Sequence, residues 1–267
     1  MKILSFDVGG TKIAWGIVDE SGTLLSEVCS IPTPQNATEI EDFFKKTVAE
    51  HQVDGFAVAT AGVVFNNHLQ GKPNNLPAGY EKIDFAALFG APYIVENDAT
   101  SALYAEWRIG ALRGVNYGVM LTLGTDVGCG IICNGQIVRG KTGAAGEYQF
   151  DFSGRALQKL AREHKLEQID CFEILQQVKQ GNEAARTIYR LWEERILDAM
   201  SMLNRLLDVE MFALSGSVSK IVDYAKINTA LKILEHHNPP TVKTAECGTN
   251  AGLIGAALLC AEKMKGK

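Results

Sequence analysis

The pattern of hydrophobic and polar positions predicts strands at the start of the chain. Residues 2–8 and 13–19 are short apolar runs rich in β-branched and aromatic residues, and a looser run follows at 22–31. Glycines separate the runs, as turns separate the strands of a sheet. Further apolar runs of strand length lie within 54–64, 91–98, 117–138 and 211–219.

Helical spacing of apolar residues predicts helices between and after these strands. Residues 37–52 show this spacing with an acidic first half, and residues 99–114 show it up to Gly114. The chain is mostly helical from 153 to 209, and 250–264 predicts a last helix with small residues on one face. Strands interleaved with helices predict an α/β fold.

The segment FDVGGTKIAWG, residues 6–16, interrupts a strand with a pair of glycines. Such a pair either forms a tight hairpin turn or lets backbone N–H groups surround a phosphate. The segment has a counterpart, because aligning Gly10-Thr11 with Gly124-Thr125 also places Gly16-Ile17 on Gly130-Ile131. Either two hairpins agree by chance, or two related lobes each offer a Gly-Thr turn to one phosphate chain.

We therefore expect a protein of two α/β lobes. The first would comprise 1–105 and be completed by the C-terminal helix 252–267. The second would comprise 106–251 and include the helical block. A chain of 267 residues is long enough to give each lobe a core of its own.

Familiar nucleotide-binding signatures are missing from the sequence. It contains no Gly-x-x-x-x-Gly-Lys-Ser/Thr, and no Gly-x-Gly-x-x-Gly follows a strand into a helix. Bound phosphates would therefore rest on turns between strands, with the Thr11 and Thr125 hydroxyls as additional donors. Asp7, just before the first turn, could reach Mg²⁺ through water, although Asp before Gly is also ordinary turn chemistry.

The segment ENDATSAL places Asn97 and Asp98 where a predicted strand passes into a helix. Both residue types are preferred helix caps, which accounts for one of them. The functional interpretation is that Asp98 accepts a proton from a substrate hydroxyl while Asn97 bonds neighbouring hydroxyls. Phosphoryl transfer needs such an aligned hydroxyl with a carboxylate beside it. An unperturbed Asp is a weak base for an alcohol, so orientation would be its main contribution.

Other polar residues fit recognition of a polyol. Glu147 follows a Gly-Ala-Ala-Gly run, and Asn74 and Asn75 lie in a proline-rich loop. Each alone is an ordinary loop residue, whereas together they supply carboxylate and amide groups for paired hydroxyls. Ser215 and Ser217 lack the nucleophile-elbow pattern, which disfavours acyl transfer.

Composition excludes several classes of protein. The net charge is −5 and the pI about 5.6, which gives no electrostatic attraction to nucleic acid. No apolar run approaches the ~20 residues of a membrane span, and the N-terminus lacks a signal peptide. Six scattered cysteines without a Cys-x-x-Cys pair predict reduced thiols rather than a zinc site. We expect a cytoplasmic protein with no nucleic-acid or membrane partner.

The assembled motifs resemble the ROK family (repressors, open reading frames and sugar kinases) of the actin-like ATPase superfamily. The resemblance covers nearly the whole chain and is specific, because seven motifs occur in order. They are DVGGTKIA at 7–14, PNNLP at 73–77, VENDATSAL at 95–103, LGTDVGCGI at 123–131, GAAGE at 143–147, LSGSVS at 214–219 and AGLIGAAL at 251–258.

The resemblance implies two RNase-H-like lobes with an interlobe cleft that closes on ATP, Mg²⁺ and a hexose. It places Asp98 on the family's catalytic base. It implies these sugar-binding residues: Gly62, Asn74, Asn97, Asp98 and Glu147. It implies these ATP-binding residues: Asp7, Gly9, Gly10, Thr11, Lys12, Gly124, Thr125 and Gly216. Family repressors carry a helix-turn-helix before the first strand, but strand one is predicted from residue 2 here, so we expect no DNA binding.

The sequence departs from the family pattern after Glu147. The family usually continues with Phe-Gly-His and a cysteine-rich zinc knuckle, whereas this chain reads GEYQFDFSGRAL with Phe150 at the histidine position. One sugar-binding His and one Glu therefore have no counterpart, and we expect no zinc. Tyr148, Phe150 and Phe152 alternate, so we expect three rings on one face to brace the Glu147 loop. Ala61 before Gly62, and Asp126 in the second turn, are further departures.

The leading hypothesis is an ATP-dependent kinase that phosphorylates a hydroxyl, the 6-hydroxyl by expectation, of glucose or a related hexose. The enzymatic alternative is an N-acetylmannosamine or β-glucoside kinase, since a missing knuckle would open the pocket. The third hypothesis is a sugar sensor that binds without transferring, although a binder would need neither Asp98 nor Asp7. We also expect a homodimer.

Overall fold

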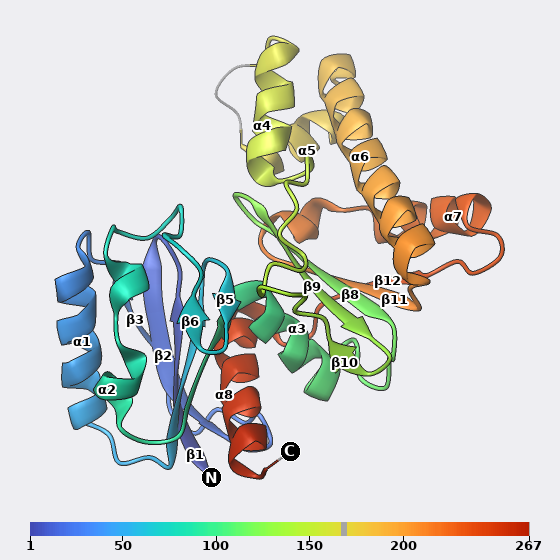
Figure 1. The fold of residues 1–267 in the computed structure, drawn as a ribbon. Coiled ribbons are helices and arrows are strands. Elements are labelled where there is room, and N and C mark those ends of the chain that lie inside the picture. The colour runs from blue at the N-terminus through green and yellow to red at the C-terminus, as the bar shows by residue number, and fades with distance from the viewer. Residues whose placement is uncertain (167–169, 267) are drawn as a thin grey trace. The chain divides into compact units, whose positions relative to one another are not determined.

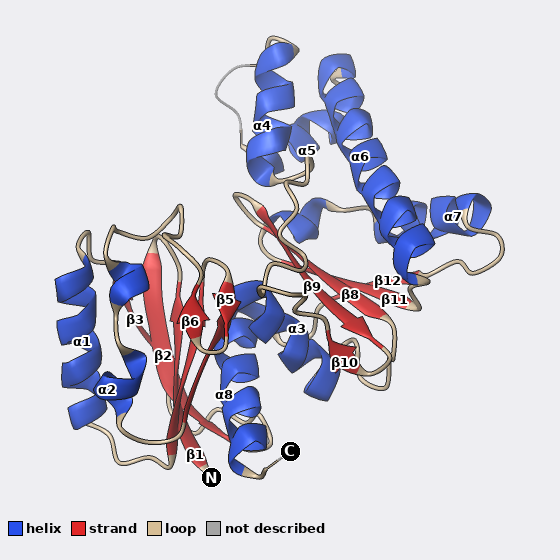
Figure 2. Cartoon of the chain, in the orientation of Figure 1, coloured by secondary structure: helices blue, strands red, loops and turns tan. Residues whose placement is uncertain are grey.

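The computed structural model describes residues 1–166 and 170–266, and the chain forms two compact units. The first comprises Met1–Gly114, Ile137–Glu147 and Glu246–Lys267, and the second comprises Val115–Gln136 and Tyr148–Ala245. Figure 1 follows the chain through both, and Figure 2 distinguishes helices from strands. Three segments of the expected second lobe, 106–114, 137–147 and 246–251, therefore lie in the first unit. The expected lobes also included 167–169 and 267, which lie outside the described residues.

The first unit is built on a mixed five-stranded sheet. Its strands are β1 (Lys2–Val8), β2 (Lys12–Asp19), β3 (Cys29–Pro32), β4 (Gly55–Thr60) and β7 (Tyr93–Asn97). Their order is β3-β2-β1-β4-β7, with β1, β4 and β7 parallel and β2 antiparallel to its neighbours. A small hairpin of β5 (Val64–Phe65) and β6 (His68–Leu69) follows β4.

Helices cover both faces of this sheet (Figure 1). They are α1 (Ala37–Ala49), α2 (Phe85–Phe89), α3 (Asp98–Ile109) and α8 (Ala251–Met264). Strand alternation turns Leu4 and Phe6 toward the α1 core, where the Phe6 and Phe44 rings lie 4.8 Å apart. Ser5 points the other way and donates to the carbonyl of Leu253 on α8 at 2.6 Å. Asp7 follows the same alternation and therefore lies on the α8 face.

The second unit repeats the sheet of the first. Its strands are β8 (Gly118–Leu123), β9 (Val127–Cys133), β10 (Gln136–Ile137), β11 (Met211–Ser215) and β12 (Thr241–Thr244). Their order is β10-β9-β8-β11-β12, with β8, β11 and β12 parallel and β9 antiparallel to β8. The strand order thus matches that of the first sheet, and β9, β8, β11 and β12 also match it in direction. The similarity between the two Gly-Thr hairpins therefore extends to whole sheets.

The helical block of the second unit consists of four helices. They are α4 (Gly154–Glu163), α5 (Cys171–Lys179), α6 (Glu183–Leu207) and α7 (Tyr224–Leu234). The fully buried Trp192 on α6 is central to their core and donates from Nε1 to the carbonyl of Phe152 at 2.8 Å. Asp170 caps α5 in a capping box with Glu173.

The three aromatic rings after Glu147 are only partly as expected. Tyr148 and Phe150 lie 4.9 Å apart and Phe150 and Phe152 lie 5.2 Å apart, so the rings do contact one another. Phe150 and Phe152 are buried in the second unit's core, whereas Tyr148 is 60% exposed. The expectation of three rings on one buried face is wrong, because no strand forms at 148–152 to impose the alternation.

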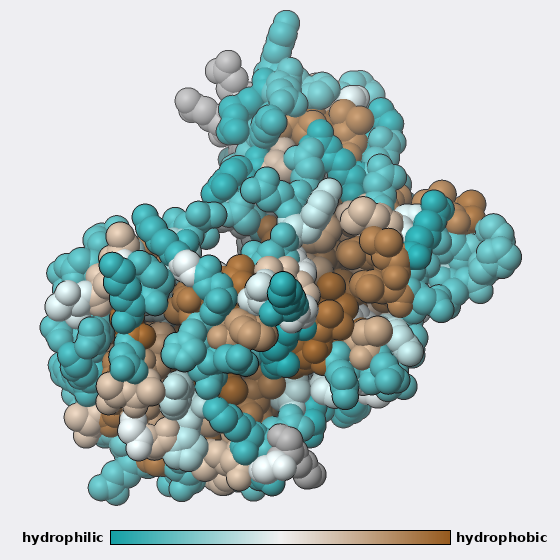
Figure 3. All heavy atoms as spheres, in the orientation of Figure 1, coloured by the Kyte–Doolittle hydropathy of each residue, from teal (hydrophilic) through white to brown (hydrophobic). Residues whose placement is uncertain are grey.

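A membrane-spanning helix needs a long apolar stretch, so the hydropathy of the surface and of the helices indicates whether the described chain contains one. Figure 3 shows hydrophilic residues over α1 on the visible face of the first unit. Within 1–166 and 170–266, no helix has the combined length and hydrophobicity that crossing a bilayer requires.

A buried carboxylate on α3 binds the chain at two places: just after α3, before the chain leaves the first unit, and just before α8, where it returns. Glu106 on α3 is fully buried and accepts the N–H groups of Ala111 at 2.8 Å, Glu246 at 3.0 Å and Cys247 at 2.6 Å. The boundaries between the units, after Gly114 and before Glu246, lie close to these acceptor bonds in the chain. Glu106 therefore attaches both segments, the one after α3 and the one before α8, to α3.

Replacing Glu106 with Ala is expected to lower the free energy of unfolding by about 3–5 kcal/mol. Three N–H groups lose their acceptor, and each unsatisfied buried donor costs about 1–3 kcal/mol. Urea unfolding followed by circular dichroism measures the loss. Glu163→Ala, at the exposed end of α4, is the control and should stay within about 0.5 kcal/mol of wild type. An equally small effect of Glu106→Ala would contradict this role.

Candidate active site

Chemically active side chains gather where the parallel strands of the first unit end. The register places Asp7 of β1 beside Ala59 of β4, and Ala59 beside Glu96 of β7. In the next row, Thr60 of β4 pairs with Asn97 of β7. The carboxyl ends of parallel strands are the usual position of ligand sites in α/β sheets.

Asn97 and Asp98 form the junction between β7 and α3. Asn97 is the N-cap, and its Oδ1 accepts the N–H of Thr100 at 2.9 Å, so capping accounts for this half of its amide. Its Nδ2 donates to the carbonyl of Gly62 at 3.0 Å. Asp98 is the first helical residue and is half-buried, with Oδ1 accepting the N–H of Ala99 at 2.8 Å.

Asp98 and Asp7 hold their protons more tightly than ordinary Asp side chains do. Burial, together with the charges of Asp7 and Glu147, raises the pKa of Asp98 to about 7. Burial also raises the pKa of Asp7 to about 6, against the opposing influence of Lys12. A carboxylate whose pKa lies near neutrality is a much better proton acceptor for an alcohol than an ordinary Asp.

Glu147 and Gly62 lie beside Asn97. The Oε1 atom of Glu147 is 3.5 Å from Nδ2 of Asn97, at the limit of a hydrogen bond, and Glu147 is exposed. Gly62 has a φ of +103° and abuts Pro73, which begins the predicted loop motif. The carboxylate of Glu147, the amide of Asn97 and the carbonyl of Gly62 thus lie together next to Asp98.

The first glycine turn abuts the proline-rich loop. A Cβ on Gly10 would lie 2.6 Å from the carbonyl oxygen of Asn75, so only glycine fits here. The turn is closed by the Gly9 N–H, which donates to the carbonyl of Lys12 at 3.0 Å. Thr11 and Lys12 are exposed, as is Asn74 in the neighbouring loop. The close approach accordingly brings the Gly-Gly turn and the Asn74 loop together.

The second glycine turn belongs to the second unit and is assembled from three segments. The N–H of Gly154, at the start of α4, donates to the carbonyl of Gly124 at 2.8 Å. Gly216, with a φ of +85°, lies so close to Leu123 that a Cβ would be 2.3 Å from its carbonyl oxygen. Thr125 is exposed beside them. The turns after β8 and β11 and the N-terminus of α4 therefore converge, an arrangement suited to an anion.

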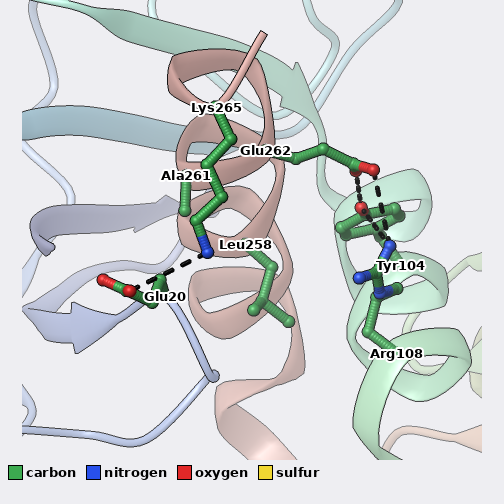
Figure 4. Close-up of a pocket in the computed structure, with 7 residues that line it drawn as sticks. All are labelled: Glu20, Tyr104, Arg108, Leu258, Ala261, Glu262 and Lys265. Carbon is green, nitrogen blue, oxygen red and sulfur yellow. Dashed lines mark hydrogen bonds and ion pairs between the residues drawn. The ribbon is translucent and has the colours of Figure 1, made fainter. Parts of the chain in front are cut away.

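A small cavity of about 150 Å³ lies elsewhere in the first unit (Figure 4). Its charged groups bond one another: Glu262 accepts from Tyr104 and Arg108, and Lys265 lies 3.8 Å from Glu20. The cavity lies near the C-terminal ends of α3 and α8, whereas Asp98 begins α3. Since a helix rises about 1.5 Å per residue, Arg108 is roughly 15 Å along α3 from Asp98. This cavity is therefore separate from the candidate active site.

No metal cluster is built into the described chain. Among residues 1–166 and 170–266, no three His, Cys, Asp or Glu side chains are grouped so as to hold a metal ion. A single carboxylate can still bind Mg²⁺, which takes few protein ligands and completes its shell with water and phosphate oxygens.

Comparison with known proteins identifies the family. The sequence model of the ROK family matches residues 3–149 and 151–263. The chain belongs to the ROK family. N-acetylmannosamine kinase of Haemophilus influenzae is 28% identical, covering 96% of this chain and 94% of that protein. Glucokinase of Streptomyces coelicolor is 34% identical over a shorter stretch, covering 54% of this chain and 48% of the relative.

Solved structures of ROK proteins share the fold. ROK hexokinase from Thermus thermophilus superposes with a TM-score of 0.84 at 24% identity, covering 100% of both chains. A ROK family glucokinase from Streptomyces griseus, in complex with glucose and AMPPNP, has a TM-score of 0.77 at 27% identity. Alignment with the latter covers 97% of this chain and 99% of that one. The predicted α/β fold of the actin-like ATPase type is confirmed.

Sequence reasoning missed two residues at this edge, Glu96 and Arg139. Glu96 is 5% exposed and precedes Asn97, and Arg139 bonds its carboxylate. The one available signal was an acid inside the otherwise apolar strand APYIVEN. Nothing local to the sequence connects this acid with an arginine that follows it 43 residues later.

Proposed function

We propose that this ROK protein is an ATP-dependent hexose kinase. The observation that carries the proposal is the half-buried Asp98, whose pKa of about 7 suits it to accept a hydroxyl proton. Asn97, Gly62 and Glu147 lie beside it with groups that bond sugar hydroxyls. The sugar kinases among the relatives, which align with the chain over almost its whole length, support the same activity.

In the proposed reaction the 6-hydroxyl of the hexose lies against Asp98. The hydroxyl oxygen attacks the γ-phosphorus of ATP, its proton passes to the Asp98 carboxylate, and ADP leaves. Asn97 and Glu147 hold neighbouring hydroxyls, which aligns the attacking oxygen. Asn74, in the loop beside Gly10, would contact the sugar as well.

The glycine turns would hold the nucleotide. We assign the phosphates to Gly9, Gly10, Thr11 and Lys12 in the first unit and to Gly124 and Thr125 in the second. Gly216 would lie on the adenosine side. Mg²⁺ fits Asp7, because a partly buried carboxylate with a raised pKa and another carboxylate nearby gains from a bound cation. When bound, the cation would neutralise charge on the phosphates.

A second candidate is an N-acetylmannosamine kinase. The relatives with that name align with 96% of this chain, whereas the alignment with S. coelicolor glucokinase covers 54% of it. The missing zinc-knuckle sequence would leave room for an N-acyl group. We also infer a cytoplasmic homodimer, and light scattering on the purified protein tests the dimer.

Sugar-stimulated release of ADP from ATP tests the proposal. The panel is glucose, mannose, N-acetylglucosamine, N-acetylmannosamine and a β-glucoside. Stimulation by glucose or mannose supports the main proposal, and exclusive stimulation by N-acetylmannosamine supports the second candidate. Sugar binding without any stimulation would overturn the kinase proposal in favour of a sensor.

The activity should depend on pH through Asp98. Because its pKa is raised to about 7, the carboxylate becomes protonated as the pH falls below that value, and a protonated Asp98 accepts no proton. We expect kcat/KM to be level above pH 7 and to fall about tenfold per pH unit below it. A pH profile with fixed ionic strength measures this, and a profile that stays level down to pH 5 would contradict the assignment.

Zinc should play no part in this protein. Residues 147–157 contain neither Cys nor His, so the usual structural zinc ligands are missing there. Elemental analysis of protein purified without a metal-binding tag should give less than one-tenth of a zinc per chain, by our rough expectation. One zinc per chain would contradict the interpretation of the segment.

A further inference from the structure

The segment Ile137–Glu147 belongs to the first unit, although the chain before and after it belongs to the second. It ends on Glu147, the carboxylate that we place on the sugar. Glu147 itself is weakly held, because among the described residues its side chain has one hydrogen-bond contact, the 3.5 Å approach to Asn97. The position of this carboxylate therefore depends on how the rest of the segment is attached.

An ion pair attaches the segment to the strand that carries the site. Both Nε and Nη2 of Arg139 contact Oε2 of Glu96, at 2.8 and 2.7 Å. The other oxygen, Oε1, accepts the N–H of Asn97 at 3.0 Å. Glu96 is 5% exposed, so the guanidinium and this N–H replace the water that a buried carboxylate loses.

Backbone hydrogen bonds connect Arg139 with the end of the segment at Glu147. The N–H of Ala145 donates to the carbonyl of Arg139 at 3.2 Å, and the N–H of Glu147 donates to the carbonyl of Ala144 at 3.2 Å. Gly143 has a φ of +84° and lies against β5, where a Cβ would be 2.1 Å from the carbonyl oxygen of Val64. The segment is thus a folded loop, fixed at Arg139 and close to the first unit at Gly143.

We propose that the Glu96–Arg139 ion pair is the positioning device for Glu147 and hence a determinant of sugar affinity. This inference rests on the proposed function, since it assumes that Glu147 bonds the sugar. Glu96 and Arg139 do not touch the substrate; they act through the segment that ends on Glu147. The aromatic rings expected for this task cannot replace the pair, because Phe150 and Phe152 are buried in the second unit's core.

A double-mutant cycle between Arg139 and Glu147 tests the inference. Arg139→Gln should raise the KM for the hexose about tenfold with kcat changed less than about threefold, because the lost bonds serve substrate and transition state alike. In a Glu147→Gln background the same change should raise KM less than about twofold, since residues that act as one unit are not additive. Arg139→Lys should be intermediate, because a lysine lacks the planar fork.

Arg186→Gln is the matched control. Arg186 pairs with Glu183 at 2.7 Å, the same distance, but both side chains are exposed on α6 of the second unit. It should leave KM unchanged. An Arg139→Gln effect on KM of equal size in both backgrounds would overturn the inference, because Arg139 would then act independently of Glu147.

Amide hydrogen exchange gives a readout that needs no activity. In Arg139→Gln the amides of Ala145 and Glu147 should exchange at least about tenfold faster than in wild type, whereas Arg186→Gln should not change them. Unchanged exchange in Arg139→Gln would overturn the inference even if the kinase is active. Faster exchange in a protein that transfers no phosphate to any sugar would uphold the attachment and reject the proposed function instead.

Discussion

Replacing Asp98 with Asn should lower kcat by roughly 10²–10⁴-fold, the range that a positioned general base contributes. Asparagine has nearly the same shape and can still accept the N–H of Ala99, so α3 should begin as before. What it lacks is the carboxylate that takes the hydroxyl proton. Because the contacts of Asn97 and Glu147 remain, the dissociation constant for the hexose should change less than about threefold.

Asp84→Asn is the control for this experiment. Asp84 is the exposed N-cap of α2 and accepts the N–H groups of Ala86 and Ala87 at 3.0 Å. Asn caps a helix about as well as Asp does, so kcat should be unchanged. Steady-state kinetics and calorimetric sugar binding measure both variants. An Asp98→Asn enzyme that keeps near-normal turnover would show that another group accepts the proton.

Replacing Gly255 with Ala should destabilise the protein by about 3 kcal/mol or more, at or beyond the upper end for overpacking. Gly255 lies on α8 against α3, where a Cβ would be 1.7 Å from the carbonyl oxygen of Ser101 and 3.1 Å from the N atom of Ala105. Both obstacles are backbone atoms of a neighbouring helix, which cannot turn aside as a side chain can. The two helices would have to move apart. Because α8 covers the face of the sheet on which Asp7 lies, the surroundings of Asp7 would change as well.

The sign of the stability change in Gly255→Ala shows whether the lost close packing or the gain in helix propensity dominates. In a helix without neighbours, Gly→Ala stabilises by about 1 kcal/mol, so a rise in stability would contradict the close approach. Gly90→Ala is the control: Gly90 ends α2 with a φ of +58° and has open space around it. There the left-handed backbone alone should cost about 1–2 kcal/mol. Urea unfolding compares both variants with wild type.

The sequence predicted the repeated sheets because their signals are local. Strand runs, Gly-Thr turns and alternation each span a few residues, and the same signals occur in both halves of the chain. The prediction of a strand over 22–31 was less accurate, since β3 covers Cys29–Pro32 and Leu24 forms only an isolated bridge to Val18. Most of that stretch is exposed despite its apolar residues, so little packing holds it in the sheet.

The sequence also singled out Asp98 and Asn97, but it did not predict the raised pKa of Asp98. Its raised pKa comes from burial and from the charges of Asp7 and Glu147, which are 91 and 49 residues away in the chain. The membership of Ile137–Glu147 in the first unit was missed for a similar reason, since its contacts there, such as Arg139 with Glu96, join residues far apart in the chain. Tertiary contacts of this kind leave no periodic signal.

The most direct test of the central claim is transfer of label from ATP to sugar. The protein is incubated with ATP labelled at the γ-phosphate, Mg²⁺ and the hexose panel, and the products are separated by chromatography. The account predicts a labelled hexose phosphate with wild type, at a rate reduced roughly 10²–10⁴-fold with Asp98→Asn. A wild-type protein that binds sugar and ATP but forms no labelled hexose phosphate would contradict the claim that this ROK protein is a hexose kinase.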